Sequence, residues 1–328
     1  MTPGSESFMS LAYDALRVFV NYQRERRLHK VRERKQAVRK ANGLLAAGGG
    51  YFDVGGTSSA IRVDGSIACW GSNGNGQAPP DGVPGNFVAI AAGFAHSLAL
   101  RVDGTIACWG VNDRGRAPPD GIPGNFVAID AGGVHSLALR VDGSIACWGL
   151  NGNGQAPPAG VPGNFVAIAA GDAHSLALRV DGSIACWGSN EDDQAPPDGV
   201  PGDFVAIAAC GEHSLALRRD GSVACWGDNN HGQAPPAGVP GNFVAIAAGD
   251  EHSLALRDDG SIACWGSNGD SQAPPAGVPG NFVAIAAGDL HSLALRVDGS
   301  IACWGLNENG QAPPAGVSGP FRVTRADL

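Results

Sequence analysis

Histidine, cysteine and tryptophan can bind metals, act as nucleophiles or form aromatic sites, and all three recur in this chain at a constant spacing. A Cys-Trp pair occurs seven times between Cys69 and Cys303, always 39 residues apart. A histidine precedes six of these pairs, and Thr57 holds its position in the first copy. The six are His96, His135, His174, His213, His252 and His291. A fixed period of this length indicates repeated structural units, so each residue has to be interpreted as part of a repeat.

The six histidines could suggest a ring of metal ligands. Each one belongs to a separate unit, however, and three or four ligands from separate units would not converge on one ion. We therefore favour structural hydrogen bonds at the start of a strand, and we predict no metal and no cofactor. The repeated tryptophans are interpreted as packing between units rather than as an aromatic binding set.

The cysteines are interpreted as buried free thiols. Seven of the eight occupy equivalent positions in separate units, which should lie beyond the roughly 7 Å between Cα atoms that a disulfide allows. Cys210 beside His213 is the one pair that could form a reactive thiol. No phosphate-binding Gly-x-x-x-x-Gly-Lys loop occurs, and no Ser/His/Asp constellation breaks the repeat. The sequence therefore predicts that the protein is not an enzyme.

The elements that position these residues are clearest in the second copy of the repeat. Alternating apolar residues predict strands at Phe87–Ala92, His96–Arg101 and Thr105–Trp109. An Asp-Gly pair marks a tight turn between the second and third strands. A turn-rich loop follows, and then a short Ala-Pro-Pro stretch that its prolines would confine to a sheet edge. Each repeat thus predicts a four-stranded antiparallel sheet.

Both faces of the second and third strands are apolar or small, so each sheet needs a neighbour on either side. Identical sheets packed around an axis meet this need. Seven copies therefore predict an all-β fold, a seven-bladed β-propeller of four-stranded antiparallel blades over residues 51–328. Residues 48–54 occupy the first-strand position of the first copy, but their sequence has diverged from that of the other copies. The segment 320–326, with Phe321 in the phase of Phe87, is expected to complete that blade and close the ring.

A basic segment precedes the repeats. Residues 1–50 hold ten Lys and Arg against four acids, whereas residues 51–328 hold twelve Arg, no Lys and twenty-seven acids. Many helix formers and no proline predict an α-helical arm from about Ser7 to Ala46, ending in a glycine-rich hinge. It could serve nuclear localisation or nucleic-acid contact, lie on a membrane surface, or remain a solvated or partner-binding helix. Its basic residues are Arg24, Arg26, Arg27, Lys30, Arg32, Arg34, Lys35, Arg39 and Lys40.

The pattern Gly-x-x-His-Ser-Leu-Ala-Leu, then x-Asp-Gly, then Trp-Gly-x-Asn-x-x-Gly-Gln resembles the regulator-of-chromosome-condensation repeat family over roughly residues 51–328. The resemblance implies a seven-bladed propeller that recognises other proteins on its surface. Members include exchange factors for the small GTPase Ran, a plant UV-B photoreceptor, β-lactamase inhibitor proteins and interaction domains of ubiquitin ligases. This chain departs from two of them. Every repeat has 39 residues, which leaves no room for the β-wedge of the exchange factors, and the photoreceptor's Gly-Trp-Arg-His-Thr clusters are missing.

Function is expected where the copies differ, at the two positions before the histidine and in the loop after Trp-Gly-x-Asn. In an antiparallel four-stranded sheet, the connections after the first and third strands lie at the same end, so both variable sites are expected on one face. This face carries twelve acids, Asp228 among them, against two arginines. Such a field attracts a basic partner and repels nucleic acid, although acidic loops could also serve solubility alone. The candidate partner-binding residues are Phe94, Asp113, Arg114, Arg116, Asp172, Glu191, Asp192, Asp193, Glu212, His231, Asp250, Glu251, Asp270, Asp289, Leu290 and Glu308.

The predicted function is a non-enzymatic, monomeric scaffold that binds another protein with a basic patch through this acidic rim. The alternative is a guanine-nucleotide exchange or regulatory factor for a small GTPase, with chromatin or nucleic-acid contact only through the basic arm. No stretch approaches the roughly 18 apolar residues of a membrane span, and acidic and basic residues interrupt the apolar N-terminal stretch where a signal sequence would be clean. We expect a cytoplasmic protein, with a nuclear location as the alternative.

Overall fold

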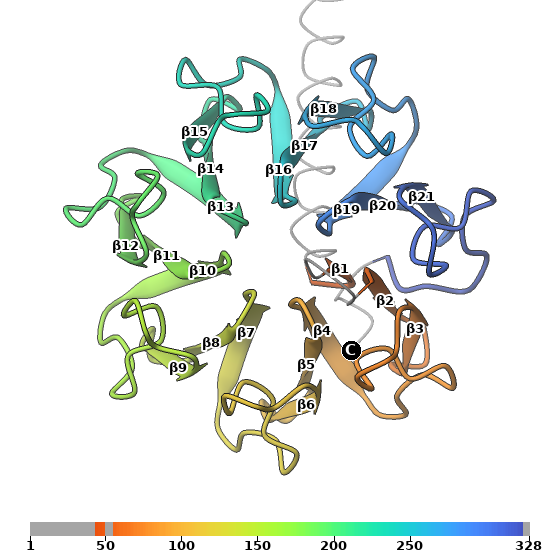
Figure 1. Ribbon diagram of the computed structural model, residues 1–328, viewed down its shortest axis with the longest axis horizontal. Coiled ribbons are helices and arrows are strands. Elements are labelled where there is room, and N and C mark those ends of the chain that lie inside the picture. Colours follow the sequence, from red (N-terminus) through yellow and green to blue (C-terminus); the bar gives the residue numbers. More distant parts are fainter. Residues whose placement is uncertain (1–42, 50–54, 324–328) are drawn as a thin grey trace, which may run out of the picture.

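The structure is a computed structural model that describes residues 43–49 and 55–323. In this part of the chain, 21 strands form seven antiparallel sheets of three strands each. The sheets stand like blades around a central axis (Figure 1). The predicted all-β, seven-bladed propeller is therefore confirmed.

The inner strands of the blades are β1 (Leu45–Gly48), β4 (Phe87–Ala92), β7 (Phe126–Ala131), β10 (Phe165–Ala170), β13 (Phe204–Cys210), β16 (Phe243–Ala248) and β19 (Phe282–Ala287). The middle strands are β2 (Thr57–Ile61), β5 (His96–Arg101), β8 (His135–Arg140), β11 (His174–Arg179), β14 (His213–Arg218), β17 (His252–Arg257) and β20 (His291–Arg296). The outer strands are β3 (Ile67–Gly71), β6 (Ile106–Gly110), β9 (Ile145–Gly149), β12 (Ile184–Gly188), β15 (Val223–Gly227), β18 (Ile262–Gly266) and β21 (Ile301–Gly305).

The turn between middle and outer strands explains why the Asp-Gly pair repeats. In the second blade, the carboxylate of Asp103 accepts hydrogen bonds from the backbone N–H and the hydroxyl of Thr105, at 2.9 and 2.7 Å. Gly104 has a φ of +83°, which residues with a Cβ rarely adopt. The outer strand then begins at Ile106, one residue later than the sequence predicts, because Thr105 belongs to this turn.

The fourth strand of each blade is reduced to one bridging residue. In the first blade Val83 exchanges two backbone hydrogen bonds of 2.9 Å with Ile67, and the other six blades carry the equivalent bridge. The predicted edge strand at Ala-Pro-Pro is wrong. Ala78 is buried, and the carbonyl of Pro79 accepts a hydrogen bond from Gly82 in a turn. Since proline lacks an N–H, pairing passes to the residue beyond this turn.

The core lies between blades rather than inside them. Leu98 and Leu100 of β5, which are 0 and 2% exposed, share an apolar cluster with Ala138 of β8 and Trp148 of β9. Large side chains of one blade thus meet small ones of the next, as the two-sided apolar pattern predicts. A single blade would expose this surface, so the blades are stable only as a ring.

The first blade takes its inner strand from both ends of the described chain. Leu45–Gly48 forms β1 and pairs with β2. Farther out, Phe321 bridges Arg62, and the Arg322 N–H donates to the Ile61 carbonyl at 2.9 Å. Phe321 is 5% exposed and its ring centroid lies 6.3 Å from that of Trp70. The C-terminal segment therefore supplies the outer end of this strand.

Two expectations at the start of the ring are wrong. Leu45–Gly48 is a strand, although the sequence predicts a helix reaching Ala46 and a propeller beginning at residue 51. The inner strand of the first copy also lies earlier than residues 48–54. Inner strands line a narrow channel, and Leu-Ala-Ala-Gly offers the small side chains that this position needs, whereas Tyr-Phe-Asp does not.

The rest of the predicted arm lies outside the described residues. This applies to the helix before residue 43 and to Arg24, Arg26, Arg27, Lys30, Arg32, Arg34, Lys35, Arg39 and Lys40. Among the residues that are described, no helix is long and apolar enough to cross a membrane.

Candidate functional site

The two variable loops meet on one face of the propeller, here called the variable face. The loop after the outer strand of one blade touches the loop between the inner and middle strands of the next. The side-chain amide of Gln194 donates to the carboxylate of Glu212, and Nε2 of His231 lies 3.3 Å from Oε1 of Glu251. The structure therefore brings together residues that the sequence places 18 to 20 positions apart.

The densest acidic cluster spans the fourth and fifth blades. Glu191, Asp192 and Asp193 are exposed at the tip of one loop, and Glu212 is half-buried beside them. Burial raises the pKa of the Glu212 carboxyl above its ordinary 4.5, and the charges of Asp192, Asp250 and Glu191 raise it further. The amide hydrogen bond from the neighbouring loop opposes this shift. These carboxylates are thus close enough to repel one another.

Asp193 holds a backbone conformation that suits glycine. Its φ is +62°, and the equivalent Gly76 of the first blade has a φ of +76°. Ser271 at +67° is the other non-glycine residue with positive φ in the described chain. A residue with a Cβ is disfavoured here, although aspartate tolerates it better than most. The tip of this loop therefore carries an acidic side chain at some conformational cost.

The cations predicted for this face have different roles. Arg116 is 8% exposed and replaces the glutamine found at this position in the other copies. Its Nη2 donates to Oδ1 of Asp113 at 2.7 Å, and its Nη1 donates to the Gly133 carbonyl at 3.2 Å. Arg116 therefore ties two blades together and offsets the charge of Asp113. Arg114 is exposed.

The remaining candidates divide by exposure. Asp270 and Glu308 are exposed on separate loops, and Leu290 is half-buried. The ring of Phe94 covers Gly133 of the next blade, where a Cβ would lie 2.8 Å from a ring carbon. Phe94 is therefore packed between loops rather than raised from the surface.

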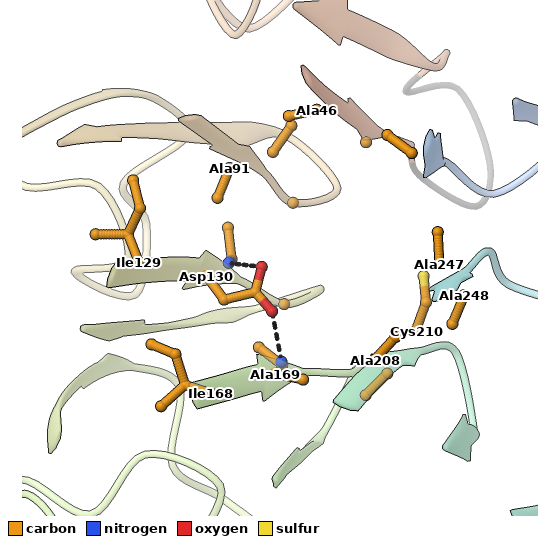
Figure 2. A pocket seen from close by; sticks show the side chains of 18 of the residues that line it. Ala46, Ala91, Ile129, Asp130, Ile168, Ala169, Ala208, Cys210, Ala247 and Ala248 are labelled. Carbon is orange, nitrogen blue, oxygen red and sulfur yellow. Dashed lines mark hydrogen bonds between the residues drawn. The ribbon is translucent and has the colours of Figure 1, made fainter. Parts of the chain in front are cut away.

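The inner strands surround a central cavity of about 520 Å³. Its wall consists mainly of alanine, glycine and isoleucine, such as Ala91, Ile129 and Ile168 (Figure 2). Asp172 and Asp289 belong to the variable loops and also line the cavity. The variable face and the channel therefore meet at one mouth.

The mouth is strongly acidic. Burial raises the pKa of Asp172 well above 3.8, and the charges of Asp289, Asp250 and Glu212 add to this. Burial, followed by the charge of Asp250, raises the pKa of Asp289 to about 7. Three of the predicted site residues, Asp172, Asp250 and Asp289, thus form an inner ring that is distinct from the exposed loop tips.

Asp130 is a functional candidate that the sequence reasoning missed. It occupies a position that is alanine in the other inner strands, such as Ala91 in β4. Its two carboxylate oxygens accept backbone hydrogen bonds from Ala131 at 3.0 Å and from Ala170 of the next blade at 2.9 Å (Figure 2). Burial raises its pKa to about 7, which the two hydrogen bonds oppose. The sequence does distinguish Asp130, because it replaces a repeated alanine inside a strand, whereas the other candidates were sought in loops.

Comparison with known proteins places these features in a family. The profile of the regulator of chromosome condensation (RCC1) repeat matches residues 87–116, 126–155, 165–194, 204–233, 243–272 and 282–311. The chain belongs to the RCC1 repeat family. No curated protein matches the chain.

Solved structures share the RCC1-repeat propeller fold. The CRINKLY WD40 ectodomain of the Arabidopsis thaliana receptor kinase ACR4 is 24% identical, with a TM-score of 0.66 over 83% of this chain and 98% of that one. The ectodomain of the Physcomitrella patens receptor kinase CR4 is 25% identical, with a TM-score of 0.63 over 80% and 72%. Prp20p from Saccharomyces cerevisiae is 24% identical, with a TM-score of 0.59 over 68% and 73%. These similarities show a common fold.

The repeated histidines of this RCC1-repeat propeller bind neighbouring blades. Nε2 of His135 lies 2.8 Å from Oγ of Ser175, whose hydroxyl donates to the Gln155 carbonyl at 3.0 Å. Because that hydroxyl proton is already used, His135 must donate from Nε2. Trp187 Nε1 donates to the same carbonyl at 2.8 Å. The structure confirms that these histidines and tryptophans hold blades together.

The thiols and the six repeated histidines are unsuited to nucleophilic or acid–base chemistry at neutral pH. All eight cysteines are free, and burial raises the pKa of the outer-strand thiols, such as Cys108, to about 12. Burial also raises the pKa of Cys210 well above 9.0. Burial lowers the pKa of His135 to about 4. In residues 43–49 and 55–323, no group of three or more His, Cys, Asp or Glu side chains could hold a metal ion.

Proposed function

We propose that this protein is a non-enzymatic scaffold that binds a basic partner protein through the variable face. The RCC1-repeat propeller points to a role in protein interaction or regulation. The observation that carries the finer proposal is the approach of Glu191 and Asp192, whose loop also carries exposed Asp193, to Glu212 of the next blade. Mutual repulsion among these carboxylates is relieved when a partner brings Lys or Arg side chains against them.

Two further features support binding at this face. Charges on rigid loops attract a partner of opposite sign over a Debye length of about 8 Å at physiological salt. The loop that carries Asp193 is closed by hydrogen bonds, including one from the Asp192 N–H to the side chain of Gln194 at 2.9 Å. The acidic tip is therefore held ready, so that little ordering entropy is lost on binding.

Regulation of a small GTPase is the second candidate. It rests on the structural similarity to Prp20p, whose structure was described together with its binding to Gsp1p and histones. A nucleotide-release assay with Gsp1p separates the two candidates. Acceleration of release would favour the regulatory role, and unchanged release alongside binding of a basic protein would favour the scaffold.

The scaffold proposal is tested by reversing the charges of Glu191, Asp192 and Asp193 to lysine. Purified histones serve as the basic probe, and the dissociation constant is measured by fluorescence titration in about 0.15 M salt. We expect binding to weaken about tenfold or more, because three attractive contacts become repulsive.

The matched control reverses three exposed aspartates at the opposite end of the outer strands, Asp81, Asp120 and Asp198. Both triple variants change the net charge equally. The control should weaken histone binding much less. Equal losses would mean that net charge alone attracts the probe, and undiminished binding after reversal at the variable face would refute the proposed site.

A further inference from the structure

The mouth of the central channel holds a buried carboxylate, one of whose oxygens receives no hydrogen bond from the described residues. Asp289 is 7% exposed, lines the cavity, and lies over Gly49, where a Cβ would be 2.7 Å from its carboxyl carbon. No donor among the described residues reaches its Oδ2. Leaving a buried charged acceptor without a partner is costly. This oxygen therefore indicates that a donor from outside these residues binds at the mouth.

The surrounding charges indicate a cation rather than a neutral donor. The charges of Asp250, Asp289 and Glu212 all act on Asp172. These acids are not arranged as a compact ligand set, since the described residues contain no cluster that could hold a metal ion. A ligand with separated positive groups fits such spread charges better than a single ion does.

A second carboxylate lies deeper in the same channel. Asp130 precedes Gly133, the mouth residue of its blade, by three positions along β7 and the loop that follows. At about 3.3 Å per residue, the two levels lie at most roughly 10 Å apart. The hydrogen bond from the Ala170 N–H, two residues before Asp172, brings the Asp130 carboxylate closer to the mouth than that. The wall between them is formed by small apolar residues, including Ala131 and Ala170. The channel is thus acidic at two depths and apolar between them.

We propose that the central channel binds a linear aliphatic polyamine, with one ammonium group at Asp289, in the field of Asp172 and Asp250, and another beside Asp130. The ammonium at the mouth donates to Oδ2 of Asp289, and the methylene groups lie against the apolar wall. The cavity volume of about 520 Å³ falls within the range of small-ligand pockets. Burial and like charges raise the pKa of Asp289, and a bound cation would offset both effects.

A lysine side chain of a partner protein offers the same alkylammonium chemistry. It carries a single charge at the end of a four-carbon stem, so it would satisfy the mouth but not Asp130 as well. The depth of Asp130 therefore favours the free polyamine, and the experiment below separates the two sources.

Spermidine binding to the full chain is measured by calorimetry in about 0.15 M salt, which screens weak surface attraction. We expect one saturable site. Asp289→Asn should weaken binding about tenfold or more, because the amide loses the charge that pairs with the ammonium. Asp130→Ala, which introduces the residue of the other inner strands, should also weaken it. The matched control Asp81→Asn, on an exposed turn, should change affinity less than about twofold.

Two further ligands identify the chemistry. Butylamine and a pentapeptide with one lysine and blocked ends each carry one ammonium, so both should bind at least about tenfold more weakly than spermidine. Neither should respond to Asp130→Ala.

Three results would overturn the proposal: no saturable spermidine binding, equal losses in Asp289→Asn and Asp81→Asn, or tighter binding of the lysine peptide than of spermidine. Melting temperatures of each variant with and without spermidine keep the test valid for less stable variants. A bound ligand raises the melting temperature of wild type and Asp81→Asn, and raises that of Asp289→Asn less.

Discussion

Replacing Asp130 by alanine should change how the stability of the propeller depends on pH. Asp130 is half-buried in the channel wall, and desolvation of its carboxyl raises its pKa from 3.8 to about 7. Alanine already occupies the equivalent position in the other inner strands, for example at Ala91 and Ala169, so the substitution introduces no foreign shape. Any pH-dependent difference between the two proteins therefore reports the ionisation of this one carboxyl.

The sign and size of this change in the free energy of unfolding follow from the linkage between proton binding and folding. Between pH 3.8 and about 7 the folded protein holds a proton on Asp130 that the unfolded chain has released. The free energy of unfolding contributed by this group is thus highest at low pH and falls as the pH rises through about 7. The full difference in pKa corresponds to about 4 kcal/mol. Between pH 5 and pH 8, wild type should lose about 2.5 kcal/mol relative to Asp130→Ala.

The measurement is urea denaturation of both proteins at several pH values from 5 to 8, followed by tryptophan fluorescence. Other carboxyls with raised pKa, such as Asp289, are present in both proteins and cancel in the difference. Asp130→Asn serves as a second reference, because it keeps a hydrogen-bond acceptor but does not titrate in this range. A difference that stays constant to within about 0.5 kcal/mol across this range would refute the reasoning, because it would mean that Asp130 ionises in the folded protein as it does in the unfolded chain.

Three other predictions concern the variable loops, the links between blades and the closure of the ring. Asp193→Gly should stabilise the fold by about 1 kcal/mol by removing an unfavourable φ, and should weaken binding of a basic partner. Ser271→Gly is its matched control, with a similar gain in stability by denaturation and unchanged binding. Ser175→Ala should cost about 1–3 kcal/mol more than Ser97→Ala, because only Ser175 accepts a hydrogen bond from a buried histidine; equal costs would mean that this bond is not needed. Phe321→Ala should cost about 3–5 kcal/mol in denaturation experiments, and a cost near zero would mean that the C-terminal segment does not close the ring.

The period of the sequence is sufficient to predict most of the fold. Strands Phe87–Ala92 and His96–Arg101 occur as expected because their alternating pattern repeats in every blade, so each copy supports the others. The first inner strand was misplaced because it lies outside the period, at Leu45–Gly48. Its partner in the same blade, Phe321, is 276 residues away. Bringing both ends of the described chain against β2 depends on ring closure, which no local pattern records.

The candidate site was predicted less completely, for a physical reason. Sequence variation locates the loops, and strand parity places them on one face, but neither shows which acids are buried. Asp289 and Glu191 looked equivalent as loop acids, yet one lines the channel and the other is exposed. Arg116 looked like a surface cation but ties two blades together. Burial depends on the curvature of the whole ring, and it cannot be read from a single repeat.

Some positions that depart from the repeat lower the stability of the fold, and the residues found at the same positions in other copies would not. Glycine at position 193 would remove an unfavourable φ, and alanine at position 130 would remove a half-buried carboxyl whose pKa is raised to about 7. Neighbouring blades contain both solutions in an otherwise identical setting. Asp130 and Asp193 thus lower the stability of the fold although glycine or alanine in other copies avoids the loss. Binding, rather than stability, is therefore the better explanation for these two residues.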